Sequence, residues 1–142
     1  MKLNIYLKIL ISAIFLYSSI AIAQIVIVTN EFSQLNSLSK KDVGALFLGY
    51  YDIVPDGDLI LPVEITGDKE LMEEFHKEYT GKTLLQLKAH WNRMIFSGKS
   101  IPPKRVDTID QAKFITERNP NVITYMRKKD VKGNLKILNV KN

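Results

Sequence analysis

Apolar residues along the chain occur with two kinds of spacing, one typical of strands and one typical of helices. The uninterrupted run IVIV at residues 25–28 ends in the polar pair Thr29-Asn30, which predicts a central strand buried on both faces. Further apolar runs predict strands over residues 59–65 and 121–126 and a short closing strand over residues 135–140. Pro62 lacks a backbone donor, so we expect its strand to be irregular or partly at a sheet edge.

Between these runs the apolar period changes to about 3.6 residues, which predicts helices. They are expected over residues 39–48, 68–80, 83–97 and 108–118. Cap signals precede three of them, namely Ser39 with Asp42, Thr83 with Gln86, and Thr108 with Gln111. Strands that alternate with helices favour an α/β fold with a largely parallel sheet covered on both faces, because parallel neighbours need crossover connections.

The helix that begins after Thr83 has the clearest signals, and we expect most of the chain to pack against it. Its apolar face is formed by Leu84, Leu87, Trp91 and Met94. Ile95 and Phe96 widen the same stripe. Gly98 and the double proline at residues 102–103 end the helix and begin a basic, stiff loop.

The first 23 residues have the pattern of a secretory signal peptide. Lys2 and Lys8 precede or flank an apolar run of 15 residues, which ends in Ala21-Ile22-Ala23 and is shorter than the roughly 20 residues that span a bilayer. We therefore expect export to the periplasm, membrane contact only through this leader, and one mature domain over residues 24–142.

Composition excludes several classes of function. The chain has no cysteine, which excludes disulfides, thiol redox chemistry and thiolate metal sites. Without Lys2 and Lys8, 18 basic residues face 15 acidic ones, and we expect this small excess to be spread along the chain. Such a diffuse charge argues against binding to nucleic acid.

The best candidate for chemistry is the turn from the second strand into the next helix. Thr66, Gly67, Asp68 and Lys69 offer a hydroxyl, a close backbone approach, helix amides and a cation, which together suit a small oxyanion. Because Asp68 is also a good helix cap, an ordinary capped helix is the alternative interpretation. Thr29 and Asn30 end another strand and are expected to share this crevice.

Signals for catalysis are absent from the sequence. His76 and His90 are the only histidines, and each is expected at a helix surface or boundary rather than as a ligand. No zinc-binding HExxH motif, nucleophile elbow or P-loop occurs. We therefore predict a protein that is not an enzyme and that uses no cofactor or metal.

Several motifs together resemble a known family. In order they are VIVTN, LSKKDVGALFLG, a DG turn with LPV, AHWNRMIFSGKSIPP and NPNVITYM. This order is similar to the phosphate transporter substrate-binding-like proteins, short exported relatives of the phosphate-binding proteins of ABC importers. The FLG helix end at residues 47–49 and the block at residues 91–103 carry the most specific part of the resemblance.

The resemblance implies one lobe of the type II periplasmic-binding fold, a three-layer α/β/α sandwich with a mixed sheet of about four to five strands. It also implies an Arg, an acidic residue and a Ser-Gly-Thr helix start after the second strand. Residues 64–70, EITGDKE, lack both the Arg and the Ser-Gly-Thr run, and Asn121 and Thr124 replace a usual glycine block. We therefore expect any phosphate binding to be weak or to need a second chain.

Two functions remain open at this stage. The chain is either a periplasmic solute-binding-like protein for phosphate or another small oxyanion, or an interaction module that kept the lobe and lost the ligand. In the first case a porin or an importer is a possible partner, and in the second a membrane sensor or transporter.

Overall fold

The computed structural model describes residues 23–52, 57 and 59–142. The predicted signal peptide, apart from Ala23, and Asp56 of the predicted turn lie outside this part. A five-stranded sheet has the order β4-β3-β5-β1-β6, with bounds Lys104–Val106, Leu61–Ile65, Val122–Arg127, Ile25–Asn30 and Leu135–Ile137. Four α-helices lie in the described part, α2 Lys40–Phe47, α3 Lys69–Tyr79, α4 Leu84–Phe96 and α5 Ile109–Thr116, with a short 3₁₀ turn η1 at Lys128–Asp130.

Strand directions make the sheet mixed. β3 runs parallel to β4 and β5, whereas β1 runs antiparallel to both β5 and β6. The expectation of a largely parallel sheet is therefore wrong for the half that contains β1. The mixed sheet of four to five strands implied by the family resemblance is confirmed.

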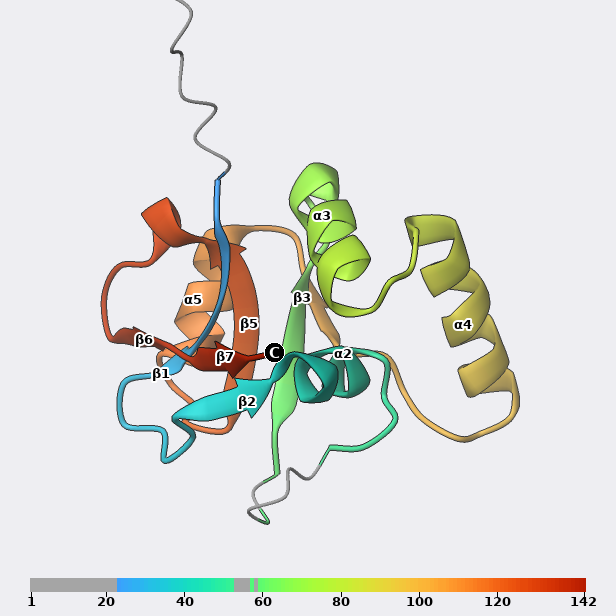
Figure 1. Ribbon diagram of the computed structural model, residues 1–142, viewed down its shortest axis with the longest axis horizontal. Coiled ribbons are helices and arrows are strands. Elements are labelled where there is room, and N and C mark those ends of the chain that lie inside the picture. Colours follow the sequence, from blue (N-terminus) through green and yellow to red (C-terminus); the bar gives the residue numbers. More distant parts are fainter. Residues whose placement is uncertain (1–22, 53–56, 58) are drawn as a thin grey trace, which may run out of the picture.

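The sheet lies between two helical layers (Figure 1). Successive residues of β1 serve opposite faces: Ile25 and Ile27 join the core shared with α2 and α3, while Val26 and Val28 pack with Met126. Both sets are buried, which confirms a strand covered on both sides. The α5 helix covers the face opposite to α2 and α3, so the layers are α/β/α.

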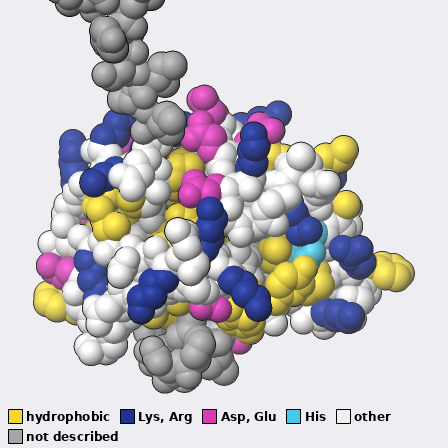
Figure 2. All heavy atoms as spheres, viewed as in Figure 1, with side chains coloured by type: hydrophobic (Ala, Val, Ile, Leu, Met, Phe, Trp, Pro, Cys, Tyr) yellow, Lys and Arg dark blue, Asp and Glu magenta, His cyan; other side chains and the backbone are white. Residues whose placement is uncertain are grey.

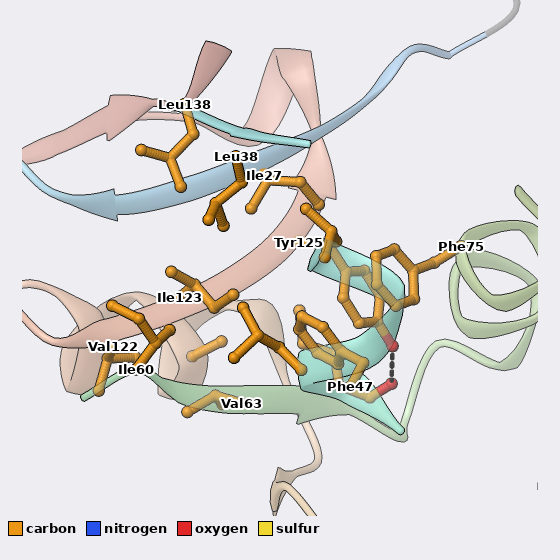
Figure 3. Close-up of a cluster of buried hydrophobic side chains, with 14 of the residues drawn as sticks. Ile27, Leu38, Phe47, Ile60, Val63, Phe75, Val122, Ile123, Tyr125 and Leu138 are labelled. Atoms are coloured by element: carbon orange, nitrogen blue, oxygen red, sulfur yellow. Dashed lines mark hydrogen bonds between the residues drawn. The ribbon is translucent and has the colours of Figure 1, made fainter. Parts of the chain in front are cut away.

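Three aromatic rings form the centre of the larger core (Figure 3). The rings of Phe75 on α3 and Tyr125 on β5 are stacked at 3.8 Å between centroids, and Phe47 on α2 meets both edge-on at 4.7 and 5.5 Å. The Tyr125 hydroxyl donates to the Ile65 carbonyl at 3.4 Å, and burial raises its pKa. Both helices of this layer are thereby fixed to the sheet.

Pro62 shapes the contact between β3 and β5. The backbone ladder between them covers only Leu61 and Pro62, and farther along the hydroxyl of Thr124 donates to the Val63 carbonyl at 2.9 Å. The predicted irregularity is confirmed. The predicted partial edge position is confirmed as well, because β4 pairs with β3 only at Val63, Glu64 and Ile65 and not at Pro62. The sequence predicted a loop at the position of β4, because the three residues of this strand directly follow the double proline at residues 102–103.

The C-terminal strand is divided in two at Leu138. β6 pairs with β1, whereas β7 at Asn139–Lys141 pairs in parallel with β2 at Ser37–Ser39 in a separate two-stranded sheet. Leu138 is buried, and its amide donates to the Ile27 carbonyl at 2.8 Å. This change of partner explains the imperfect alternation of residues 135–140.

The α4 helix lies at the side of the sandwich (Figure 1), so the expectation that the chain packs around it is wrong. Its capping box between Thr83 and Gln86 is confirmed. Its buried face forms a small separate cluster made of Leu48, Leu87, Trp91 and Met94. Ile95 and Phe96 are 55% and 97% exposed, so the expectation that they widen the buried stripe is wrong.

Candidate functional site

Two strand-to-helix turns meet at the carboxyl ends of β3 and β4. The Thr66 amide donates to the Val106 carbonyl at 2.8 Å, and the Thr66 hydroxyl donates to the same oxygen at 3.1 Å. A Cβ on Gly67 would lie only 2.0 Å from the Asp107 carbonyl oxygen, so a side chain there is excluded. We expected Gly67 to admit a ligand, but the group that it admits is the neighbouring turn.

A crevice of about 370 Å³ opens where these turns meet. Its lining comes from the starts of α3 and α5 and from the end of η1, and consists of Ile65, Gly67, Asp68, Asp107, Thr108, Ile109, Asp110, Lys113 and Asp130. Two helix N-termini thus lie at one place, each with the positive end of its dipole. In sheets of this kind ligands usually bind at such a place.

Side chains of the protein already cap both helix starts. The Asp68 carboxylate accepts from the Leu71 amide at 2.9 Å. The Thr108 hydroxyl accepts from the Gln111 amide at 3.2 Å, and the Gln111 side chain accepts from the Asp107 amide at 2.9 Å. The alternative interpretation, an ordinary capped helix, therefore describes the start of α3 in this structure.

The crevice is acidic. Its charged lining groups are Asp68, Asp107, Asp110, Asp130 and Lys113. The Lys113 ammonium lies 3.9 Å from the Asp110 carboxylate and its side chain is 19% exposed. Lys69, the cation predicted for this site, is exposed and does not line the crevice. The cation that lines the crevice is Lys113 on α5. Its position about one turn after the Thr108 cap was the only signal for it in the sequence.

Thr29 and Asn30 lie at the opposite end of the sheet from this crevice. Because β1 is antiparallel to β5 and β3 is parallel to it, the ends of β1 and β3 point in opposite directions. Thr29 donates to the Val122 carbonyl at 2.8 Å, and the Asn30 amide donates to the Glu117 carbonyl at 2.6 Å. The expectation of a shared crevice is wrong, since it assumed a parallel sheet.

The two motifs that carry the family resemblance contact each other. Gly49, which ends the FLG motif, has φ +67°, and a Cβ there would lie 2.4 Å from Ser100 Oγ and 2.7 Å from the Trp91 ring. The Lys99 amide donates to the Met94 carbonyl at 3.0 Å, which closes the α4 helix. This close approach requires glycine at position 49 and joins α4 to the end of α2.

Both histidines are buried, so the expectation of surface or boundary positions is wrong. His76 Nε2 lies 2.5 Å from Glu64 Oε1, and both side chains are fully buried. The other oxygen of Glu64 lies 3.6 Å from the Arg105 guanidinium. His90 Nε2 lies 2.8 Å from the Leu48 carbonyl. In the part of the chain that the structure describes, no cluster of three or more His, Asp or Glu residues is placed to hold a metal ion.

No family model matches the chain, and no curated protein matches it in sequence. Solved structures match its fold. An ABC-type phosphate transport receptor from Vibrio cholerae has a TM-score of 0.60 at 12% identity, over 82% of this chain and 45% of that chain. A phosphate ABC transporter substrate-binding protein with bound phosphate, from Clostridium perfringens, has a TM-score of 0.64 at 16% identity, over 82% and 44%. PstS from Borrelia burgdorferi has 0.54 at 14% identity, over 82% and 46%.

The chain has the fold of a phosphate-receptor lobe. It spans less than half of the length of each receptor, which confirms the predicted single lobe. The structure shows which residues stand where the family resemblance implies phosphate-binding residues. Where the resemblance implies an Arg and a Ser-Gly-Thr start, the chain has a buried Glu64 paired with His76, and an Asp68 cap.

Proposed function

We propose that the chain is an exported, non-catalytic solute-binding-like protein that takes part in phosphate uptake. In this proposal the crevice between the starts of α3 and α5 binds phosphate or a related small oxyanion. Binding is weak in the single lobe, and a second chain, such as an importer or a porin, completes the site. The observation that carries the proposal is a receptor-lobe fold with two helix N-termini at one crevice.

The charges of the crevice support weak rather than strong binding. A phosphate dianion would meet one lysine and four aspartates, which are Asp68, Asp107, Asp110 and Asp130. One side of the crevice is open to water, where a charge pair 4 Å apart contributes only about 1 kcal/mol. We therefore expect a dissociation constant of about 1 mM for the isolated lobe.

Thermal unfolding of residues 24–142 tests this proposal directly. With a dissociation constant of about 1 mM, about 10 mM phosphate stabilises the folded state by about 1.4 kcal/mol. That corresponds to a rise in Tm of about 4 to 6 °C for a domain of this size. Sulfate and chloride at matched ionic strength are the controls. An equal rise with all three anions would contradict specific binding.

Two lysines make a matched pair for locating the site. Lys113→Gln removes the cation that lines the crevice and should abolish the phosphate-dependent rise in Tm. Lys69→Gln removes an exposed lysine at the start of α3 that does not line the crevice, and it should leave most of the rise intact. If Lys69→Gln abolishes the phosphate-dependent rise in Tm and Lys113→Gln does not, the anion binds near the start of α3 and outside the crevice.

The second candidate function is an interaction module without a ligand. The observation that favours it is that side chains of the protein already satisfy both helix starts in the crevice. In this case phosphate, sulfate and chloride should give the same Tm, and the acidic crevice would contact a basic surface of a membrane sensor or transporter. Asp107→Asn distinguishes the two functions, because removing this carboxylate should strengthen phosphate binding only if phosphate enters the crevice.

A further inference from the structure

The outward face of α4 exposes large apolar side chains on either side of one polar residue, Asn92. Leu85, Ala89 and Phe96 are spaced by four and seven residues, so they share one stripe along the helix. Leu85 is 78% exposed and Phe96 is 97% exposed. The loop that follows α4 continues this surface with Ile101, which is 84% exposed. Among the described residues, none covers these side chains.

Basic residues flank this stripe on both sides. At about 100° per residue, Lys88 and Arg93 lie about 60° to either side of the line through Leu85 and Phe96. Both are exposed, and neither forms an ion pair with the described residues. Figure 2 shows apolar and basic side chains intermixed on the side of the molecule where α4 lies.

The stretch that contains α4 has basic residues and no acidic ones. From Tyr79 to Val106 there is no acidic residue, and the basic residues are Lys82, Lys88, Arg93, Lys99, Lys104 and Arg105. Residues 127–141 form a second basic segment, with six basic residues and one acidic residue. The expectation of an evenly spread charge is therefore wrong, because the excess lies mainly in these two segments.

We propose that α4 and the loop to Ile101 form a docking surface for an anionic lipid bilayer. A helix that presents Leu and Phe outward between Lys and Arg has the composition of an interfacial helix, in which the apolar groups enter the acyl boundary and the cations contact headgroup phosphates. Because Phe96 is 97% exposed at the C-terminal end of α4, a fluid bilayer can accept it without a preformed pocket. This proposal is independent of the function of the crevice.

Two other occupants fit the surface less well. A second copy of the chain in a twofold contact would place Lys88 and Arg93 opposite the same residues, where like charges repel. An acidic protein would satisfy the cations but would need a cavity for Phe96. Among the described residues no helix is long and apolar enough to cross a membrane.

Co-sedimentation with lipid vesicles tests the proposal. Residues 24–142 contain every described strand and helix, and they exclude the apolar leader that would itself bind lipid. We expect binding to vesicles of equal parts phosphatidylglycerol and phosphatidylcholine, little binding to phosphatidylcholine alone, and release by high salt. Absence of binding to the anionic vesicles would overturn the proposal, even if an acidic protein bound the same surface.

Matched variants show whether this surface is responsible. The double variant F96S/I101S should weaken the vesicle partition by about tenfold or more, whereas Phe32→Ser, which removes another exposed phenylalanine elsewhere, should not. K88E/R93E should abolish binding, and K129E/K132E, with the same change of net charge on another surface, should retain most of it. Equal losses in the test and control variants would also overturn the proposal.

Discussion

The two apolar clusters of the molecule differ in what their helices meet. The larger cluster combines 18 buried residues from both helical layers and from the sheet. The cluster under α4 has four, Leu48, Leu87, Trp91 and Met94, with Met72 and Leu84 at its margin. The local signals are equally good in both regions, because α2 and α4 each begin with a complete capping box. A well-marked helix is therefore no evidence of a central helix.

The difference also has a consequence for dynamics. In the larger core, Phe75 and Tyr125 join α3 to the middle strand of the sheet, so local opening would break the whole fold. The α4 helix is joined to the rest mainly through Leu48 at the end of α2, whose carbonyl accepts from His90, through Met72 and through the contact of Gly49 with Trp91. We expect α4 to open as a separate unit at a lower free energy than the sheet.

The largest expected effect comes from one substitution made in both regions. Leu71→Ala in the larger core should lower the free energy of unfolding by about 4 kcal/mol, and Leu87→Ala under α4 by about 2.5 kcal/mol. Both side chains are buried, at 0% and 2% exposure, but the smaller cluster can close over the cavity by moving α4. Urea denaturation measures both values. A larger loss in Leu87→Ala would contradict the ranking of the two clusters.

Hydrogen exchange distinguishes the mechanisms of these two losses. In Leu87→Ala the amides of α4 should exchange faster than in the parent protein. The amides of β5 should lose only the protection that the lower global stability accounts for. In Leu71→Ala both sets should lose protection together. Uniform loss in both variants would show that α4 opens only with the whole domain.

Sequence reasoning succeeded where local chemistry decides the outcome. The caps at Ser39, Thr83 and Thr108 depend on side chains three residues apart, and all three capping boxes are present. The burial of β1 on both faces was also predictable, because its run of apolar residues has no alternating polar positions. Strand direction was not readable, since nothing in IVIV distinguishes a parallel from an antiparallel neighbour.

The candidate site was predictable only in part for the same reason. The turn at Thr66-Gly67-Asp68 was found from the change of period, and its Gly67 and Asp68 line a crevice, whereas Thr66 does not. Its other side comes from residues 107–113, which become neighbours only through the pairing of β3 with β4. That strand has three residues and follows two prolines, so the sequence contains little signal for it. Burial of His76 was likewise missed, because its partner Glu64 lies on another element.

The two buried histidines give the next comparison. His76→Leu leaves the buried Glu64 carboxylate with only Arg105 nearby, which should lower the free energy of unfolding by about 3 kcal/mol. His90→Leu leaves one carbonyl, that of Leu48, without this partner and should cost about 1 kcal/mol. Chemical denaturation measures both.

A double variant tests the reason for this difference. If the cost of His76→Leu comes from a buried Glu64 carboxylate that has lost its hydrogen-bond partner, E64L/H76L should recover part of the lost stability, because it removes the carboxylate together with that partner. If the double variant is less stable than His76→Leu, packing around the histidine rather than charge pairing is responsible.

The smallest expected effect is the influence of pH on the N-terminal caps of α2, which belongs to the larger core, and of α4. The side-chain hydrogen bond from Ser39, with a second from Tyr51, lowers the pKa of Asp42 in the cap of α2. A lowered pKa in the folded state stabilises the fold above the ordinary value of 3.8, and this contribution is lost as pH falls through the folded pKa. The cap of α4 uses Gln86 and does not titrate.

We therefore expect Ser39→Ala and Thr83→Ala to differ in their dependence on pH. Each should cost about 1 kcal/mol at neutral pH, because each removes one capping box. Below pH 3.8 the cost of Ser39→Ala should shrink, since protonated Asp42 no longer serves the cap in either protein, whereas the cost of Thr83→Ala should stay constant. Thermal unfolding of the two variants and the parent across this range measures the difference. Parallel curves for the two variants would show that Asp42 contributes to α2 through its shape rather than its charge.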